Sequence, residues 1–135
     1  MNSLFPLTCS DDLPADRDFY RHLLGLEVAF ENDWYVQLRH PRNGAAQMAF
    51  VRRDHDSVPE GHRARPAGVI VTVEVDEVDP LHARARELSL PIVQELRDEH
   101  WGQRHFITRD PSGLLVDLVQ LIPPSAEYAS GYAGG

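Results

Sequence analysis

The feature that most constrains this chain is an internal repeat of one secondary-structure pattern. The segment HLLGLEV at residues 22–28 recurs 64 positions later as RELSLPI at residues 86–92, and both lie where a predicted helix gives way to a strand. In each copy, a short apolar strand precedes the helix and three strand-like runs follow it. Such a unit leaves one sheet face uncovered, so we expect the copies to complete each other, either side by side or exchanged between chains.

Apolar spacing and end signals place one helix in each copy. A polar cluster at residues 10–12 can cap the first helix, and Gly25 suits its C-terminal turn. In the second copy, Asp79 followed by Pro80 is a natural cap and first-turn pair. The predicted fold class is therefore α+β, with two βαβββ modules forming a curved mixed sheet that carries its helices on the outside.

The length of the chain bounds its domain organisation. A chain of 135 residues with 42% hydrophobic content suits one well-packed domain and is too short for two independent ones. We expect this domain over residues 1–122, followed by a flexible tail at 123–135. Within the domain, module one is expected at 3–52, a linker at 53–68 and module two at 69–122.

Charge and cysteine content exclude several classes of protein. A net charge of −8 disfavours nucleic acid as a partner, because an acidic body repels a phosphate backbone. The sequence has neither a basic leader nor a run of about 18 apolar residues, so we expect no signal peptide and no membrane span. The single cysteine, Cys9, excludes an intrachain disulfide and fits a reducing, cytoplasmic location.

Three motifs occur together in the order of the repeat: FYRHLLGL at residues 19–26, EVDEVD at 74–79 and DPSG at 110–113. In this combination, the chain resembles the vicinal oxygen chelate superfamily of glyoxalase, bleomycin resistance and dioxygenase-like proteins, over residues 4 to about 121. The resemblance implies the two-module fold and, as in bleomycin resistance proteins, a homodimer that encloses a small organic ligand. It is fairly specific for the fold and far less specific for any activity.

In metal-using members of that superfamily, side chains from the first and last strands of each module hold a divalent ion. Matching the motifs assigns these positions to Leu4, Ile70, Asp117 and either Gln47 or Met48. A divalent ion needs several oxygen or nitrogen donors, and neither Leu4 nor Ile70 has one. We therefore expect no metal in the family's site and no cofactor.

Asp117 lies within an otherwise apolar strand-like run, LLVDLVQL at residues 114–121. An unpaired buried charge costs several kcal/mol or becomes neutral, so we expect Asp117 to have a bonding partner or a role in binding or catalysis. Three interpretations stay open. Asp117 is a structural carboxylate paired with Arg104 or His105 on the preceding strand, a polar anchor for a ligand, or a general base.

Aromatic residues suggest where an organic ligand would lie. Trp34 and Trp101 each occur at a turn among polar neighbours, where a core residue is less expected, so we predict that they form the rim of a pocket. The predicted ligand-binding residues join these two tryptophans to four strand residues: His105, Asp117, Gln47 and Phe50. No catalytic residue is assigned.

The leading interpretation is metal-independent binding of a small organic ligand in an aromatic-lined cavity, as in bleomycin resistance proteins. An alternative is an enzyme: a glyoxalase- or dioxygenase-type lyase with displaced metal ligands, or an isomerase that uses Asp117 and a histidine for acid/base chemistry. A third is an accessory domain with an empty cavity. The sequence leaves open whether any reaction is catalysed.

Overall fold

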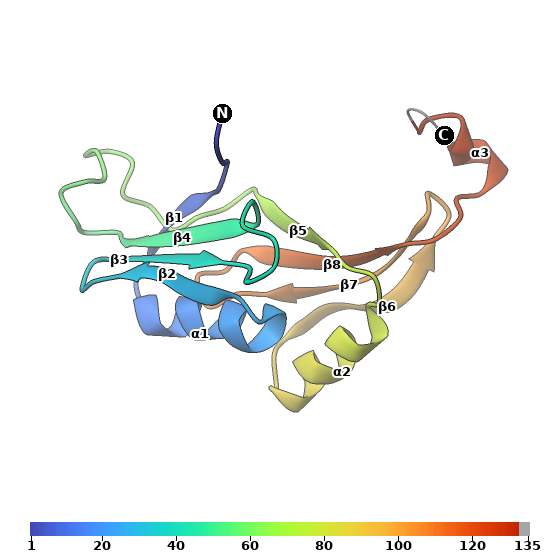
Figure 1. Cartoon of the computed structure of the whole chain (residues 1–135), viewed down its shortest axis with the longest axis horizontal. Helices are drawn as coiled ribbons and strands as arrows, with labels where there is room; N and C mark the ends of the chain where they lie inside the picture. Colours follow the sequence, from blue (N-terminus) through green and yellow to red (C-terminus); the bar gives the residue numbers. More distant parts are fainter. Residues whose placement is uncertain (133–135) are drawn as a thin grey trace. The chain divides into compact units, whose positions relative to one another are not determined.

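The structure is a computed structural model that describes residues 1–132 as two compact units (Figure 1). Unit 1 contains Met1–Gly68 together with Asp110–Leu114, and unit 2 contains Val69–Arg109 together with the chain from Leu115 onward. Each unit has one four-stranded mixed sheet. The predicted α+β fold class with two βαβββ modules is confirmed by this element order.

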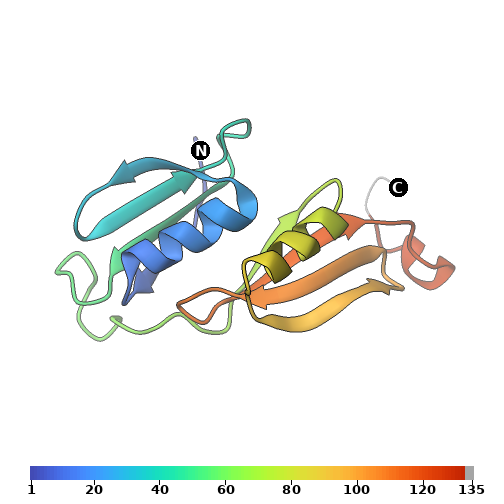
Figure 2. The same ribbon diagram turned by 90° about the horizontal axis from the view of Figure 1, so that it is seen from below.

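Unit 1 follows the predicted order of strand, helix and three strands. Its elements are β1 (Leu7–Ser10), α1 (Leu13–Leu24), β2 (Glu27–Glu31), β3 (Tyr35–Arg39) and β4 (Gln47–Arg52). The strands lie in the order β1-β4-β3-β2, with β1 parallel to β4 and the other neighbours antiparallel. Helix α1 connects the two edge strands and lies across one face of the sheet (Figure 2).

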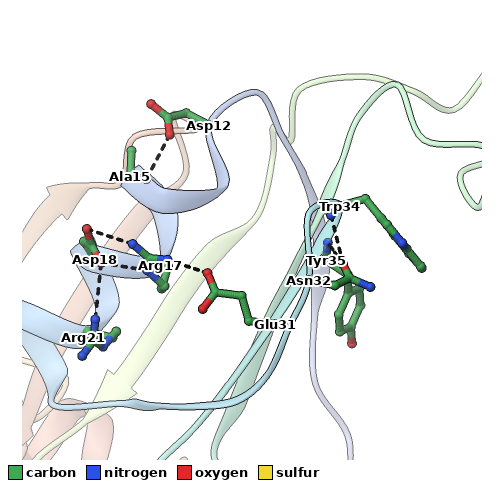
Figure 3. Close-up of polar contacts among 9 residues, drawn as sticks. All are labelled: Asp12, Ala15, Arg17, Asp18, Arg21, Glu31, Asn32, Trp34 and Tyr35. Atoms are coloured by element: carbon green, nitrogen blue, oxygen red, sulfur yellow. Dashed lines mark hydrogen bonds and ion pairs between the residues drawn. The ribbon is translucent and has the colours of Figure 1, made fainter.

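Helix α1 begins and ends where its sequence predicts. Among the polar residues before it, Asp12 is the cap: its Oδ1 accepts a hydrogen bond from the backbone N–H of Ala15 at 3.1 Å (Figure 3). Gly25 ends the helix with a φ of 70°, a conformation that glycine adopts without steric cost. Arg17 ties the helix to β2 by an ion pair with Glu31, with 2.5 Å between the nearest nitrogen and oxygen (Figure 3).

Alternation along the strands divides the unit 1 sheet into a buried face and an open face. The buried side chains between α1 and the sheet are Phe19, Tyr20, Leu23, Val36, Leu38, Met48 and Phe50. Tyr35, Gln37 and Gln47 alternate with the buried strand residues, so they point to the opposite, open face. The open face of unit 1 is therefore polar at its centre.

The turn Asp110–Leu114 belongs to unit 1 although it lies between two strands of unit 2. The hydroxyl of Tyr20 donates to Asp110 Oδ2 at 2.7 Å, and the hydroxyl of Ser112 donates to Asp16 Oδ2 at 2.6 Å. All four side chains are buried. The Tyr20–Asp110 bond joins the FYRHLLGL and DPSG motifs, and the Ser112–Asp16 bond anchors the same turn to helix α1.

Unit 2 repeats the pattern and adds a short helix. Its elements are β5 (Ile70–Glu74), α2 (Asp79–Glu87), β6 (Ile92–Glu99), β7 (Gln103–Arg109), β8 (Leu115–Leu121) and α3 (Ala126–Ala129). The strand order is β5-β8-β7-β6, with β5 parallel to β8. No helix within residues 1–132 is long and apolar enough to cross a membrane.

The start of α2 differs from the prediction by one residue. Asp79 is the first helical residue rather than the cap, and Pro80 follows it in the first turn. The cap position is Val78, whose backbone N–H donates to Gln120 Oε1 at 3.0 Å. The capping group therefore comes from β8, a distant strand that local sequence cannot reveal.

Candidate functional site

The open face of the unit 2 sheet carries a histidine and carboxylates in direct contact. Phe106 and Leu118 are paired across β7 and β8, and both are fully buried. His105 and Asp117 each lie one residue away from this pair, so both point to the opposite face. Thr72 of β5 lies beside Asp117 in the same register.

His105 lies between two carboxylates on this face. Its Nδ1 is 2.7 Å from Asp117 Oδ1, and its Nε2 is 3.1 Å from Glu99 Oε2. Gln94 Nε2 is also 3.1 Å from His105 Nε2. Each ring nitrogen of His105 therefore faces one carboxylate oxygen, to which a ring N–H can donate. We call His105, Asp117, Glu99 and Gln94 the His105 cluster.

The His105 cluster is largely shielded from water. The side chains of His105, Asp117 and Glu99 are 5%, 15% and 12% exposed. Burial favours a raised pKa for Glu99, but hydrogen bonds from His105 and Arg97 outweigh it and hold the pKa of Glu99 below its usual value. Glu99 is therefore held as a carboxylate.

The partner of Asp117 is one of the two candidates that the sequence offers. Asp117 pairs with His105, whereas Arg104 pairs with Asp79 and Asp98, at 2.9 Å in each case. Arg104 belongs to the helix face of the sheet, because it is one residue away from His105 along β7. The bond to His105 uses Oδ1 of Asp117, whose side chain is 15% exposed.

Trp101 lies beside the His105 cluster, in the turn between β6 and β7. Its indole Nε1 donates to Gln103 Oε1 at 2.9 Å. The indole meets the His105 ring edge to face, with 6.4 Å between ring centroids and an angle of 74°. Because Trp101 remains 39% exposed, part of the ring is available to a ligand.

Exposed apolar side chains also occur on the strands around the cluster. Ile70 is 52% exposed and pairs with Leu115 at one end of the sheet, and Leu121 is 55% exposed at the other end. Exposed apolar side chains beside a few placed polar groups are typical of sites for small organic molecules.

The predicted site residue Gln47 lies in a neutral ladder on the open face of unit 1. Tyr35 donates to Gln37 Oε1 at 2.9 Å, Gln37 donates to Gln47 Oε1 at 2.5 Å, and Gln47 donates to the Gly44 carbonyl at 2.8 Å. Burial raises the pKa of the Tyr35 hydroxyl, which therefore stays protonated. Sequence reasoning missed Tyr35 and Gln37, although they alternate with the apolar Val36.

Two aromatic residues of the predicted site lie elsewhere in unit 1. Phe50 is fully buried on the helix face, with its ring centroid 5.5 Å from that of Tyr20. Trp34 ends the turn between β2 and β3, which is held by Asn32, whose side chain accepts from the N–H of Trp34 at 2.9 Å (Figure 3). His55 stacks on the Trp34 ring at 3.8 Å and 1°, so one face of that ring is covered. Within unit 1, Phe50 is thus part of the core beneath the helix, and Trp34 is packed against the 53–68 loop.

The side chains at the superfamily's metal positions do not fit a divalent ion. Leu4 and Ile70 are hydrocarbons, Met48 is buried in the core, and the amide of Gln47 is engaged in the ladder. The carboxylates of the His105 cluster lie against opposite nitrogens of one ring, so they do not converge on a common point. Within residues 1–132, no group of three or more His, Cys, Asp or Glu is arranged to hold a metal ion.

Comparisons with known proteins agree with this architecture. The model of the Glyoxalase/Bleomycin resistance protein/Dioxygenase superfamily matches residues 7–118. TnmS3, an antibiotic binding protein from Streptomyces sp. CB03234, is 19% identical, with a TM-score of 0.68 over 90% of this chain and 96% of that one. Lactoylglutathione lyase from Agrobacterium tumefaciens is 20% identical, with a TM-score of 0.67 over 89% of this chain and 92% of that one.

A third structure, a superfamily member from Sphaerobacter thermophilus DSM 20745, is 22% identical, with a TM-score of 0.72 over 89% of this chain and 97% of that one. At such identities the likeness shows a shared fold. No curated protein matches the chain.

Proposed function

The chain belongs to the Glyoxalase/Bleomycin resistance protein/Dioxygenase superfamily, and from that premise we propose that it binds a small organic ligand without a metal ion. The observation that carries the proposal is the His105 cluster, which lies beside the half-exposed Trp101 ring. The likeness to an antibiotic binding protein supports binding as a function of this fold. The lack of donors at Leu4 and Ile70 supports independence from metal.

The chemistry of the site favours planar ligands that carry a positive charge or hydrogen-bond donors. The Trp101 ring offers a surface for stacking, and the carboxylate of Asp117 offers an acceptor. Stacking and burial contribute roughly 1 to 3 kcal/mol, and a charge-assisted hydrogen bond contributes a similar amount. After the costs of association, these terms support micromolar affinity.

The test is a titration of planar cationic and anionic compounds, followed by calorimetry in the presence and absence of EDTA. We expect cations to bind more tightly, chelation to leave affinity unchanged, and Trp101→Ala and Asp117→Asn each to weaken binding about tenfold. Trp34→Phe tests whether the predicted rim tryptophan of unit 1 also contacts the ligand, and an unchanged affinity would restrict the site to unit 2. Binding that both site substitutions leave intact would place the ligand elsewhere. Binding lost on chelation would refute independence from metal.

We also propose that the protein works as a cytoplasmic homodimer. The edge strands β2 and β6 carry exposed apolar side chains, with Phe30 at 54% and Val93 at 50%. Symmetric pairing is a common way to cover such edges. Light scattering at micromolar concentration tests the assembly, and a monomer mass would refute it.

Acid/base catalysis is a second candidate function. The 2.7 Å contact between Asp117 and His105 Nδ1 favours it, because a carboxylate that orients an imidazole is a common arrangement in acid/base catalysis. Incubating a ligand that binds in D₂O and following its acidic C–H positions by NMR tests this function. Deuterium uptake that is lost in His105→Gln would support it, and no uptake would leave binding as the function.

A further inference from the structure

The chain after β8 turns back to the β6–β7 turn of the same unit. Ile122 donates its backbone N–H to the Gly102 carbonyl at 2.9 Å, and Ser125 donates to the His100 carbonyl at 2.8 Å. Figure 1 shows the helix of this segment, α3, at the end of unit 2 where β6 meets β7. We call residues 122–132 the C-terminal strap.

The C-terminal strap also contacts the residue between those two carbonyls, Trp101. The hydroxyl of Tyr132 donates to the Trp101 carbonyl. The ring of Tyr128 meets the indole edge to face, with centroids 6.4 Å apart and an angle of 71°. Tyr132 therefore holds the backbone of Trp101, and Tyr128 and Gln103 restrict its side chain.

The C-terminal strap packs closely against Gly102. A Cβ there would lie 2.9 Å from the Ile122 carbonyl oxygen, and 3.2 Å from both Pro124 Cβ and the Tyr132 hydroxyl. The backbone of Gly102 also has a φ of 101°, which side chains rarely allow. Position 102 therefore requires glycine for two reasons, its positive φ and the close approach of the strap. Only the close approach involves the strap.

We propose that the C-terminal strap is a specificity element of the ligand site, because it holds the Trp101 indole against the His105 cluster. A fixed ring selects flat ligands that match its orientation, whereas a mobile ring accepts ligands of many shapes with lower affinity. The effect on ligand choice rests on the proposed binding function. The effect on the Trp101 ring does not, so it can be measured without any ligand.

The first experiment measures acrylamide quenching of Trp101 in the full-length protein. The sequence contains two tryptophans, so the Trp34→Phe background leaves Trp101 as the only tryptophan, whose emission is excited selectively over that of tyrosine. In this background, we expect Gly102→Ala to raise the quenching constant about twofold or more, because the added methyl group prevents the strap from packing against residue 102. Gly113 is the matched control: its φ is 99°, and a Cβ there meets no atom within 4 Å. Gly113→Ala should leave Trp101 quenching unchanged.

A milder variant keeps the proposal testable if Gly102→Ala does not fold. Tyr132→Phe removes only the hydroxyl that reaches the Trp101 carbonyl. We expect a smaller rise in quenching, with the circular dichroism spectrum unchanged. If a folded Gly102→Ala protein, or Tyr132→Phe where Gly102→Ala does not fold, quenches like its parent, the strap does not position Trp101 and the proposal is wrong.

The second experiment measures ligand choice with two cationic probes, proflavine, which is planar and aromatic, and spermidine, which is flexible and aliphatic. We expect the parent protein to prefer proflavine and Gly102→Ala to reduce that preference about tenfold. If quenching rises but the preference is unchanged, the strap positions Trp101 without setting specificity. If the parent binds neither probe nor any compound of the wider panel, the binding function fails and the specificity role fails with it, while the quenching result still stands.

Discussion

The two units repeat one backbone pattern and place different chemistry on their open faces. In unit 1, a neutral ladder runs from Tyr35 through Gln37 to Gln47. In unit 2, carboxylates flank His105 on both sides. Neutral hydrogen bonds are individually modest, whereas hydrogen bonds in which the donor or the acceptor is ionised are about twice as strong. The two units thus share their element order and strand order, while the side chains on their open faces differ.

The units also differ in how they hold a buried acid. Asp16 of unit 1 is 1% exposed and accepts hydrogen bonds from the hydroxyls of Ser10 and Ser112, at 2.5 and 2.6 Å. Asp117 of unit 2 is bound instead by an imidazole. Asp16 is therefore held by two hydroxyls and Asp117 by one ring nitrogen.

The largest effect is expected from His105→Ala, which leaves Asp117 without its partner on the open face of unit 2. A hydrogen bond to a charged group that is mostly buried contributes about 1.5–3 kcal/mol, and we expect the free energy of unfolding to fall by that amount. Gln37→Ala, the neutral counterpart in unit 1, should cost about 1 kcal/mol or less. Urea unfolding at pH 7 measures both free energies of unfolding. Equal losses would show that the His105 contacts stabilise unit 2 no more than the neutral ladder stabilises unit 1.

A smaller effect with a defined pH dependence is expected from Asp16→Asn. Burial raises the pKa of Asp16 above its ordinary 3.8, although the Ser10 and Ser112 hydroxyls oppose the shift. Folding therefore favours the protonated acid, and the contribution of Asp16 to stability is lost as pH rises above about 4 through the folded pKa. Relative to wild type, Asp16→Asn should gain about 1 kcal/mol as pH rises from 4 to 7, measured by urea unfolding across that range.

Asp18 on the same helix provides a control of opposite sign. A hydrogen bond from Arg17 lowers the pKa of Asp18, so its contribution to stability is present above its unfolded pKa and is lost as pH falls. Asp18→Asn should therefore lose stability relative to wild type as pH rises. A flat difference between Asp16→Asn and wild type from pH 4 to 7 would mean that Asp16 titrates alike in the folded and unfolded chains.

The order of the strands explains what the sequence could reveal about these faces. Asp117 was expected to pair with Arg104 or His105 because they lie on the preceding strand, but neither QRHFITR nor LVDLVQL alternates strictly, so the sequence could not choose between the two. Along β4, Met48, Ala49, Phe50 and Val51 are all buried, so no alternation marks which side chains face the helix. Phe50 was predicted to bind the ligand, and its ring lies buried on the helix face of unit 1.

Contacts between distant segments could not be predicted from local patterns. The 53–68 loop returns His55 onto Trp34, and nothing in either segment signals that stack. Likewise, the turn DEHWGQ shows that Gly102 follows Trp101 but does not show that the C-terminal strap needs it. Such contacts depend on where whole elements lie, which the period of a single strand or helix does not determine.

The smallest effect is expected where the two units are most alike, at the ion pairs that tie each helix to an edge strand. Arg17 of α1 pairs with Glu31 of β2, and Arg86 of α2 pairs with Glu95 of β6 at 2.9 Å. Exposed ion pairs contribute little, because water screens them and ordering two long side chains costs entropy.

Glu31→Gln should therefore lower the free energy of unfolding by about 0.5 kcal/mol or less, and 1 M salt should abolish the difference. Glu95→Gln is the matched variant in unit 2. We expect the same salt dependence, because the side chains of Arg86 and Glu95 are 58% and 60% exposed. Urea unfolding at low and high salt measures both. A loss at Glu31 that persists in 1 M salt would show that the shorter Arg17 pair is shielded from solvent and that unit 1 depends on it more than unit 2 depends on its counterpart.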